Sequence, residues 1–456
     1  SVVKIGVVPT VEIAQVIAHW LQSLAIKPFV VVDPVMASSS DNRAFASDDL
    51  LNIIAPLLPS INLLTPNLNE LPALLQPSPA NLKLPTVELA SLFFNQQIGF
   101  TGELLVKGGH ATEGLQTQLT DRLYRRSKYS KNPAAQWRQT RQPVTLRGTG
   151  CALSTAISCA RHQEYSILDA ITLATARLQK SFQHALLNAS ALTTFKTDLS
   201  SSTGWSTDIN HYPEVANDVD LAIENYRYDE LTFKKGLYPI VDSADWVARL
   251  ANSNINTIQL RLKNQTTEQL RIEITQAVEL ARQYNLQLFI NDHWRLAIEL
   301  GAFGVHLGQE DLADADLQAI AKAGLRLGLS THGDFELLRA YQLRPSYITV
   351  GAIFPTQTKD MTGQIQGLHR LKRYTQLITD IPVVAIGGIN ESNINEVLAQ
   401  QPDMVAVVSA VMKADNPEQS CQKLDKLCKR ADQKQRVSRS ETRLLQEHAR
   451  VTQALN

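Results

Sequence analysis

Short apolar runs alternate with longer amphipathic segments through residues 1–190. The runs are rich in Val, Ile and Leu, and they predict strands at 3–8, 29–36, 62–65 and 103–107. The segments with apolar residues at helical spacing predict helices at 11–25, 48–58, 87–97, 150–161 and 166–187. Because parallel strands need helical crossovers, this alternation predicts a parallel sheet covered by helices.

Residues 191–235 interrupt the alternation. Ser, Thr, Asp and Asn dominate the stretch, and Gly204 and Pro213 add turn signals. We therefore expect a connection between domains, with Trp205 and Tyr212 as the side chains able to order part of it.

A second regular pattern begins at Leu237. Eight short β-type runs follow, at 237–242, 257–263, 286–292, 304–308, 325–332, 347–354, 383–388 and 404–411. Helical segments fill most of the gaps, at 268–284, 294–300, 314–323 and 391–399. Eight strands with intervening helices predict a (β/α)8 TIM barrel. An open doubly wound sheet is the alternative, and the even spacing favours closure.

The residues after Val411 are polar and mix both signs of charge, which predicts a frayed helix or a solvated extension. The expected organisation is an α/β domain over 1–190, the connection over 191–235, the barrel over 236–425 and a polar tail over 426–456.

Charge and composition narrow the function classes. Lys and Arg number 44, as do Asp and Glu, so the formal net charge is zero and nothing indicates a nucleic-acid partner. No apolar run is long enough to cross a membrane, and the first residues carry no secretory signal pattern. The four cysteines form neither a disulfide framework nor a zinc-spaced group, so we expect a cytoplasmic protein. Whether it forms a homo-oligomer is left open.

Candidate chemistry in the second half starts with one strand-like run. Barrel active sites lie at the carboxyl ends of strands. In the run 257–263, Gln259, Arg261 and Lys263 share one face because strand side chains alternate. Two cations on a buried strand are costly without an anion to meet them, so the run predicts an anionic ligand. An internal ion pair with neighbouring acids is the alternative.

Carboxylates lie at or just after the ends of the next two runs. Asn291 and Asp292 end the run 286–292, and Asp311 comes three residues after the run 304–308. Mg²⁺ uses few protein carboxylates and fills its remaining positions with water and phosphate oxygens, so Asp292 and Asp311 predict a magnesium site. Taken alone, each aspartate could equally cap a helix.

The last three runs point to phosphate. The run 347–354 is followed by Thr356, Thr358 and Lys359. The run 383–388 ends in Gly387 and Gly388, and the run 404–411 contains Ser409. This fold commonly holds a phosphate after its seventh and eighth strands. At the first site, three cations and Mg²⁺ exceed two carboxylates by a charge of roughly three, which matches a bound diphosphate. Two phosphorylated substrates, one of them a diphosphate, indicate displacement of diphosphate by a nucleophile.

Residues 237–411 closely resemble the thiamine-phosphate synthases, through the motifs QLRLK, FINDHWRLAIELGAFGVHLGQEDL, GLSTH, VGAIFPTQTK, VVAIGGIN and VAVVSAV in that order. The resemblance implies that hydroxymethylpyrimidine diphosphate is joined to a thiazole phosphate through a pyrimidine carbocation, giving thiamine phosphate and diphosphate.

The resemblance also implies site residues. The pyrimidine diphosphate would be held by Gln259, Leu260, Arg261, Leu262, Lys263, Asn291, Ser330 and Lys359. The thiazole phosphate would be held by Thr356, Gln357, Thr358, Gly388, Val408 and Ser409. Mg²⁺ would be bound by Asp292 and Asp311, while Arg261 and Lys359 would stabilise the charge on the leaving diphosphate.

The first half carries a second set of motifs. LRGTGCALSTAI (146–157) places Gly-Thr-Gly at the start of a predicted helix, where backbone N–H groups make an anion hole. With DPVM (33–36), TPNLNE (65–70) and VKGGH (106–110), it resembles the hydroxymethylpyrimidine/phosphomethylpyrimidine kinases of the ribokinase-like superfamily.

That resemblance implies an ATP-dependent kinase. Its anion hole would be Gly148, Thr149 and Gly150, with Cys151 in the catalytic position. Asn67 and Glu70 would belong to the Mg·ATP site, and Lys107 would lie near the nucleotide phosphates. The alternative role for Cys151 is that of a small buried core residue at a helix start.

The first half departs from the kinase pattern at three points. Arg147 stands where the family usually has His, and the loop ASSSDNRAF after DPVM lacks the usual Lys or Gly. The family's N-terminal portion, with its Ala-Gly-Ser-Asp strand end, is absent from the sequence, so we expect a fragment of a longer fused enzyme. The alternative is a degenerate kinase kept as a scaffold.

Together the halves predict a bifunctional protein of thiamine biosynthesis, in which the kinase product is the synthase substrate. Two alternatives stay open, a thiazole tautomerase-like barrel and a non-catalytic scaffold or ligand sensor. Asp292, Asp311 and Lys359 argue against the first alternative. His306 and His332 are expected to be structural residues or indirect supports of the site.

Overall fold

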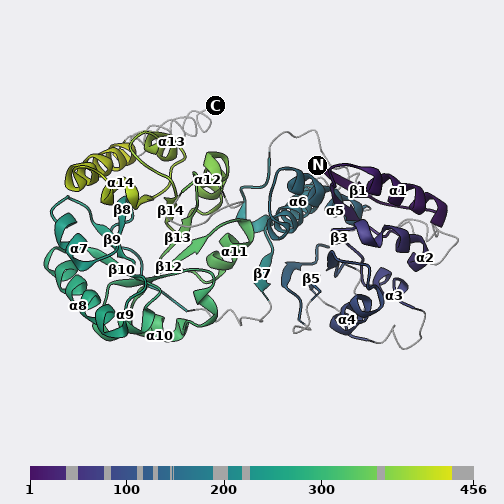
Figure 1. Ribbon diagram of the computed structural model, residues 1–456, viewed down its shortest axis with the longest axis horizontal. Coiled ribbons are helices and arrows are strands. Elements are labelled where there is room, and N and C mark those ends of the chain that lie inside the picture. Colours follow the sequence, from purple (N-terminus) through teal and green to yellow (C-terminus); the bar gives the residue numbers. More distant parts are fainter. Residues whose placement is uncertain are drawn as a thin grey trace, which may run out of the picture. The chain divides into compact units, whose positions relative to one another are not determined.

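The computed structural model describes residues 1–36, 50–76, 84–109, 117–126, 132–143, 146, 148–187, 204–217, 226–356 and 365–433. The chain divides into two compact units, Ser1–Ala222 and Ile223–Asn456 (Figure 1). Within the described ranges, no helix is both long enough and apolar enough to cross a membrane.

The first unit is built on a seven-stranded sheet whose strands pair in sequence order. They are β1 (Val2–Ile5), β2 (Phe29–Val32), β3 (Leu63–Leu64), β4 (Glu103–Val106), β5 (Gln118–Tyr124), β6 (Ala135–Thr140) and β7 (Glu214–Asn217). β1 to β4 pair in parallel, as predicted, whereas β4 to β7 pair antiparallel, so the all-parallel expectation is wrong for this part. One face of an antiparallel sheet can be exposed to water and can carry polar residues. β5 (QLTDRLY) and β6 (AQWRQT) contain such residues, so neither strand appears as an apolar run in the sequence.

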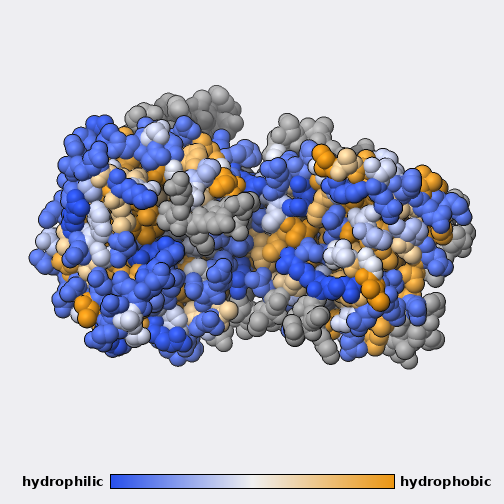
Figure 2. Space-filling model, in the orientation of Figure 1, coloured by the Kyte–Doolittle hydropathy of each residue, from blue (hydrophilic) through white to orange (hydrophobic). Residues whose placement is uncertain are grey.

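The helical elements of this unit are α1 (Val11–Ser23), α2 (Leu50–Ile54), η1 (Ala55–Ser60), α3 (Glu70–Ala73), α4 (Thr86–Gln96), α5 (Thr149–His162) and α6 (Ile167–Leu187). Several of these elements contribute side chains to one apolar core that they share with the parallel strands. Examples are Ile53, Leu57 and Phe93. The helix expected over 48–58 is divided, because Pro56 lacks the N–H that an α-helix needs and the chain tightens into η1. Figure 2 shows hydrophobic residues at the surface over α1, where Val16 and Trp20 are exposed.

Residues 204–217, expected within the connection between domains, belong to the first unit. They form η3 (Ile209–His211) and β7, and β7 pairs with β6. Trp205 donates a hydrogen bond to Gln163 (2.9 Å), just after α5. Contacts of this kind with the preceding chain order a segment whose composition alone predicts turns.

The second unit is a closed barrel of eight parallel strands. They are β8 (Gly236–Val241), β9 (Thr257–Leu260), β10 (Gln287–Asn291), β11 (Gly304–Leu307), β12 (Arg326–Thr331), β13 (Tyr347–Val350), β14 (Val383–Ile386) and β15 (Met404–Val407). The predicted strand count and closure are confirmed. Most strands are shorter than the apolar runs, so the last residues of those runs lie in the loops where barrel chemistry takes place.

Helical elements follow the strands in turn (Figure 1). They are α7 (Ala244–Leu250), α8 (Thr267–Gln283), α9 (Trp294–Leu300), η4 (Asp311–Ala313), α10 (Leu317–Lys322), α11 (Asp334–Gln342), α12 (Gly367–Leu377), α13 (Ile394–Leu398) and α14 (Ser409–Met412). The helix expected over 314–323 begins at Leu317, because the side chain of Asp316 caps its first turn by accepting the Ala319 N–H.

Aromatic side chains fill the barrel. Phe289 packs edge-to-face against Tyr347 (ring centroids 5.0 Å apart) and Tyr238 (6.0 Å), and all three are buried. The barrel interior is therefore a packed core and not an open channel.

The stretch expected as a polar extension contains a helix over 417–433. Cys421, Leu424 and Cys428 recur at helical spacing and are buried, and buried Asp425 accepts the N–H of Leu237 in β8 (3.4 Å). The boundary expected at residue 425 therefore falls inside a helix that packs on the barrel. Residues 434–456 of the expected tail lie outside the described residues.

Candidate functional site

The end of β9 presents an amide and a cation. Gln259 is buried and donates to the Tyr238 hydroxyl (3.0 Å). Arg261 lies just beyond the strand, where its backbone N–H bonds the Val241 carbonyl of β8 (2.8 Å). Lys263 is exposed in the loop that follows. The side chains predicted on one strand face are therefore divided between the barrel interior and the loop at its rim.

Asp292 and Asp311 lie together at the ends of neighbouring strands. Asp292 follows β10 with a φ of 63°, and Asp311 at the start of η4 accepts the Gly308 N–H (3.0 Å). Burial, followed by the charge and hydrogen bond of Asp311, raises the pKa of Asp292 to about 6, while Arg261 opposes the shift. The structure thus brings together the two carboxylates that we expected at one site.

This carboxylate pair suits a divalent cation. Two carboxylates in one site repel each other, and a hard cation with oxygen ligands removes that repulsion. In the described part of the chain, no group of three or more His, Cys, Asp and Glu side chains forms a metal site. Two carboxylates with open positions are the donor set that Mg²⁺ uses together with water and phosphate oxygens.

A hydrogen-bonded chain leads from the barrel interior to Ser330 at the end of β12. His306 Nε2 lies 2.8 Å from the Ser330 hydroxyl, and His306 Nδ1 lies 2.9 Å from the Tyr347 hydroxyl. Burial, helped by the Arg261 charge, lowers the pKa of His306 to about 3. The imidazole therefore stays neutral at physiological pH and acts as a buried polar partner of Ser330. Asn291, the last residue of β10, is buried as well.

The ends of β13, β14 and β15 form the side expected to hold a second phosphate. Gly387 and Gly388 have φ values of 105° and 65°. A Cβ at Gly388 would lie 2.5 Å from the Pro355 carbonyl oxygen, so glycine lets the loop after β14 lie against the loop after β13. Val408 and Ser409 follow β15 directly, and Ser409 is the first residue of α14.

Three residues expected in the phosphate loop lie outside the described residues, namely Gln357, Thr358 and Lys359. Thr356 is described, half-buried, immediately before them. The roles assigned to these four residues stay predictions.

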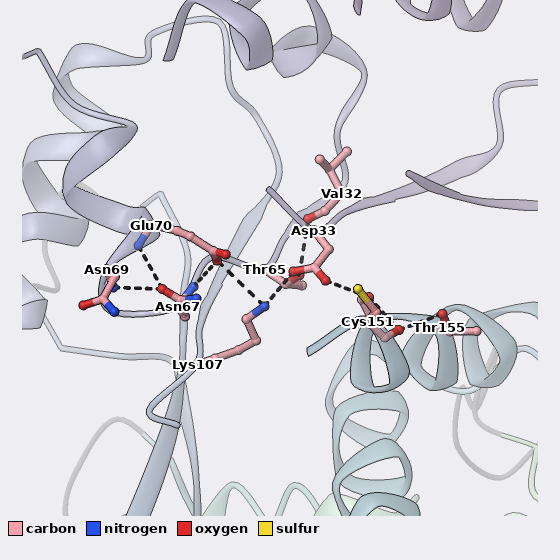
Figure 3. A network of polar contacts seen from close by, with 10 residues as sticks. Val32, Asp33, Thr65, Asn67, Asn69, Glu70, Lys107, Cys151 and Thr155 are labelled. Carbon is pink, nitrogen blue, oxygen red and sulfur yellow. Dashed lines mark hydrogen bonds and ion pairs between the residues drawn. The ribbon is translucent and has the colours of Figure 1, made fainter. Parts of the chain in front are cut away.

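The parallel strands of the first unit end in a buried network of charges (Figure 3). Lys107, after β4, bonds Asp33, after β2 (2.6 Å), and its ammonium nitrogen lies 3.9 Å from the carboxylate of Glu70. The Asn67 N–H donates to the Glu70 carboxylate (2.7 Å), and the Glu70 N–H donates to the Asn67 side chain (2.9 Å). Burial raises the pKa of Glu70 although Lys107 opposes the shift. Asn67, Glu70 and Lys107, expected at one nucleotide site, lie together.

Helix α5 begins beside this network. Its N-cap, Gly148, has a left-handed conformation with a φ of 79°, and a Cβ at Gly150 would lie 3.2 Å from the Lys107 nitrogen. The N–H groups at the start of a long helix, with a lysine nearby, are features that suit an anion. Burial and the Asp33 charge raise the pKa of the Cys151 thiol, which keeps it protonated near neutral pH. Cys151 is exposed, so its expected alternative as a buried core residue is wrong.

Two buried carboxylates that interact with Lys107 are not among the predicted site residues. Asp33 accepts from Lys107 and from the Ser154 hydroxyl of α5 (3.4 Å). Asp121 of β5 accepts the Gly108 N–H (2.8 Å), and burial raises its pKa. The DPVM motif is the available sequence signal for Asp33, whereas Asp121 lies in a polar strand that carries no motif.

Two family models match separate segments of the chain. The model described as Phosphomethylpyrimidine kinase matches residues 1–193. The model described as Thiamine monophosphate synthase matches residues 237–411.

Curated proteins and solved structures are similar to parts of the chain. The thiamine-phosphate synthase of Photorhabdus laumondii is 54% identical over 189 residues, which are 41% of this chain and 88% of the relative. That of Escherichia coli (strain K12) is 49% identical over 187 residues, 41% of this chain and 89% of the relative. A thiamine phosphate pyrophosphorylase structure from Pyrococcus furiosus has 31% identity, covers 43% of this chain and 97% of its own, and gives a TM-score of 0.40. A pyridoxal kinase structure from Staphylococcus aureus has 19% identity, covers 47% of this chain and 71% of its own, and gives a TM-score of 0.36.

Proposed function

Because this chain belongs to the thiamine-phosphate synthase family, we propose that its barrel joins hydroxymethylpyrimidine diphosphate to a thiazole phosphate at the carboxyl ends of its strands. The chain is a thiamine-phosphate synthase of thiamine biosynthesis that also carries a phosphomethylpyrimidine kinase domain. The observation that carries the proposed site is the carboxylate pair Asp292 and Asp311 with Arg261 beside it.

Asp292 and Asp311 are the proposed ligands of Mg²⁺. Their oxygen donors fit a hard divalent cation, as does the pKa of Asp292, which is raised by burial and then by the charge of Asp311. Bound there, Mg²⁺ supplies positive charge that stabilises the leaving diphosphate. Arg261 adds charge from the chain itself, and Lys263 and Lys359 are proposed to add the rest.

The proposed reaction breaks a C–O bond and forms a C–N bond. Diphosphate leaves the pyrimidine methylene with the bonding electron pair, and the thiazole nitrogen supplies the pair for the new bond. If departure precedes attack, the pyrimidine passes through a cation. A neutral His306 beside Ser330 supports this route, because it places no repelling charge near that cation.

The remaining barrel residues are proposed to bind and orient the two substrates. Those assigned to the pyrimidine diphosphate, besides the cations, are Gln259, Leu260, Leu262, Asn291 and Ser330. Those assigned to the thiazole phosphate are Thr356, Gln357, Thr358, Gly388, Val408 and Ser409. The close approach of the backbone at Gly388 to Pro355 supports a shared phosphate pocket, because a side chain there would fill it.

In the first unit, the proposed activity is transfer of a phosphoryl group from ATP to phosphomethylpyrimidine, which makes the diphosphate substrate of the barrel. The backbone N–H groups of residues 148–150 would donate hydrogen bonds to phosphate oxygens. Cys151 would lie beside them as a neutral thiol in the catalytic position. Asn67 and Glu70 would lie near Mg·ATP. Since Lys107 already bonds Asp33, nucleotide phosphates have to compete with that carboxylate for the lysine.

The test is a single-pot synthesis assay read by liquid chromatography. The full chain is incubated with Mg²⁺, thiazole phosphate and either pyrimidine diphosphate, or pyrimidine monophosphate and ATP. Thiamine phosphate from both mixtures supports both proposed activities. Product from the diphosphate mixture alone limits the chain to its barrel activity and overturns the kinase proposal. No product from either mixture would overturn both and favour a scaffold or ligand sensor.

A further inference from the structure

Two glutamine side chains hold the carboxyl end of β12 from opposite sides. The Gln309 amide donates to the Ser330 carbonyl (2.7 Å), and the Gln366 amide donates to the His332 carbonyl (2.6 Å). Ser330 is a proposed pyrimidine-diphosphate residue, and neither glutamine has a role in the proposed site. Gln309 thus bonds the backbone of a proposed substrate contact, and Gln366 bonds the backbone two residues beyond it.

Gln309 belongs to the loop that carries Asp311. That loop is folded by the bond from the Gly308 N–H to the Asp311 carboxylate (3.0 Å). Behind Gln309, the guanidinium of Arg339 donates to its amide oxygen (3.3 Å), and Arg339 is only 8% exposed. A donor on its oxygen leaves the amide N–H₂ group directed to Ser330. Gln309 therefore ties a proposed metal ligand to a proposed substrate residue on the next strand.

Gln366 makes the corresponding link on the other side of β12. Its backbone N–H bonds the Ala352 carbonyl after β13 (2.8 Å), and its amide oxygen lies 3.0 Å from the Tyr374 hydroxyl. Tyr374 belongs to α12, which is anchored to α11 by the buried ion pair of Arg373 and Asp334 (2.6 Å). Gln366 thus ties the end of β12 to the segment that leads into Pro355 and the proposed thiazole-phosphate side.

We propose that Gln309 and Gln366 are positioning residues that set the two substrate sides of the synthase site separately. This inference rests on the proposed function. Gln309 acts through Asp311 and Ser330 on the pyrimidine diphosphate and its metal. Gln366 acts on the thiazole phosphate through Ala352, in the described first part (351–356) of the connection after β13. Neither amide touches a reacting atom. Each amide instead holds a substrate-binding group in its position.

The experiment measures full steady-state kinetics of Gln309→Met and Gln366→Met in the full chain. Methionine keeps the length of the side chain and removes the donor and acceptor. Gln309→Met raises the KM for pyrimidine diphosphate and the half-saturating Mg²⁺ concentration by about tenfold, with the KM for thiazole phosphate changed by less than about twofold. Gln366→Met gives the reverse pattern, because a misplaced loop after β13 weakens the thiazole-phosphate side.

Gln287 supplies a matched control. It is buried at the opposite end of the barrel, where its amide donates to the Phe233 carbonyl (2.9 Å) and the Thr257 hydroxyl (2.8 Å). Gln287→Met lowers the Tm as a lost buried amide should, and leaves both KM values unchanged. Arg339→Met is a second variant for the Gln309 arm, since it frees the amide to rotate and raises the same KM by about threefold.

The outcomes separate the inference from its premise. If Gln309→Met and Gln366→Met lower the Tm and leave both KM values unchanged, as Gln287→Met does, the positioning roles are wrong while the proposed site stands. Equal KM changes for both substrates in each variant would overturn the separation of the two sides. Wild-type kinetics in Asp292→Ala would overturn the proposed site and the inference with it.

Discussion

The two units hold a pair of carboxylates in opposite ways. In the barrel, Asp292 and Asp311 interact directly, and their repulsion contributes to a pKa of about 6 for Asp292. In the first unit, Lys107 lies between the carboxylates of Asp33 (2.6 Å) and Glu70 (3.9 Å). Among the described residues, no salt bridge joins a cation to Asp292 or Asp311, whereas Lys107 pairs with both Asp33 and Glu70.

This difference teaches what each unit requires of its ligands. A cation arriving at the barrel relieves a repulsion that the fold maintains. A ligand arriving at the first unit has to share or displace Lys107, and separating a buried ion pair leaves charges in a poor solvent. If the proposed cation binds, the repulsion between Asp292 and Asp311 would therefore be relieved on binding, whereas Lys107 is already paired with the carboxylates of the first unit.

The largest effect is expected for Asp292→Ala. Loss of one of two proposed metal ligands lowers kcat/KM for thiamine phosphate synthesis by about 10³-fold or more, because charge on the leaving diphosphate is no longer stabilised. Phosphorylation by the first unit stays unchanged in the same preparation. Asp314→Ala, at an exposed acid beside η4, is the matched control. Synthesis near the wild-type rate in Asp292→Ala would falsify the proposed diphosphate site.

Lys107→Met tests the other side of the comparison. It leaves two carboxylates buried without their cation, since Lys107 is 9% exposed and Asp33 is 1% exposed. The first unit loses about 3 kcal/mol of stability while the barrel keeps its transition, as measured by differential scanning calorimetry. Lys423→Met, which breaks an exposed pair with Glu391, serves as the control and leaves the Tm unchanged. If Lys107→Met leaves the unfolding transition of the first unit unchanged, the ion pair contributes nothing to the stability of that unit.

A smaller effect is expected in the pH dependence of the barrel. The pKa of Asp292, about 6, lies above the ordinary value of 3.8, so the folded protein keeps a proton that the unfolded chain releases. The stability this carboxyl contributes is present below pH 4 and is lost as pH rises to 6. Mg²⁺ has to displace the same proton. As pH increases towards 6, the half-saturating Mg²⁺ concentration therefore decreases by about tenfold per pH unit, and it becomes constant above pH 7. Calorimetric Mg²⁺ titrations between pH 5 and 8 measure this, and binding that is independent of pH would contradict it.

The sequence predicts the barrel better than the first sheet for a physical reason. Strands such as β13 are buried on both faces and appear as continuous apolar runs between helices. β5 and β6 mix polar with apolar residues, and β7 lies in a polar stretch, so no apolar run marks these strands. The helix over 417–433 is hidden for a related reason, because cysteines supply part of its buried face.

The candidate site divides along similar lines. Asp292 and Asp311 can be predicted because a carboxylate at a strand end has a place in the fold before any side chain is positioned. Gln309 and Gln366 cannot, because their partners are backbone carbonyls on another element and the sequence has no pattern for such bonds. Lys107 can be assigned to the nucleotide site by resemblance, but its bond to Asp33 follows only from the structure.

The smallest effect concerns two exposed thiols on one helix, Cys151 and Cys159 of α5. Burial and the Asp33 charge raise the pKa of Cys151, so its thiolate fraction at pH 8 is small and iodoacetamide modifies it several-fold more slowly than Cys159. Asp33→Asn removes one cause of the shift and leaves Lys107 without its closest carboxylate, so Cys151 reacts faster while Cys159 keeps its rate. Mass spectrometry of the native protein gives both rates in one sample. Faster modification of Cys151 than of Cys159 in the wild type would mean that the charges of Lys4 and Lys107, rather than burial and Asp33, set the local potential at Cys151.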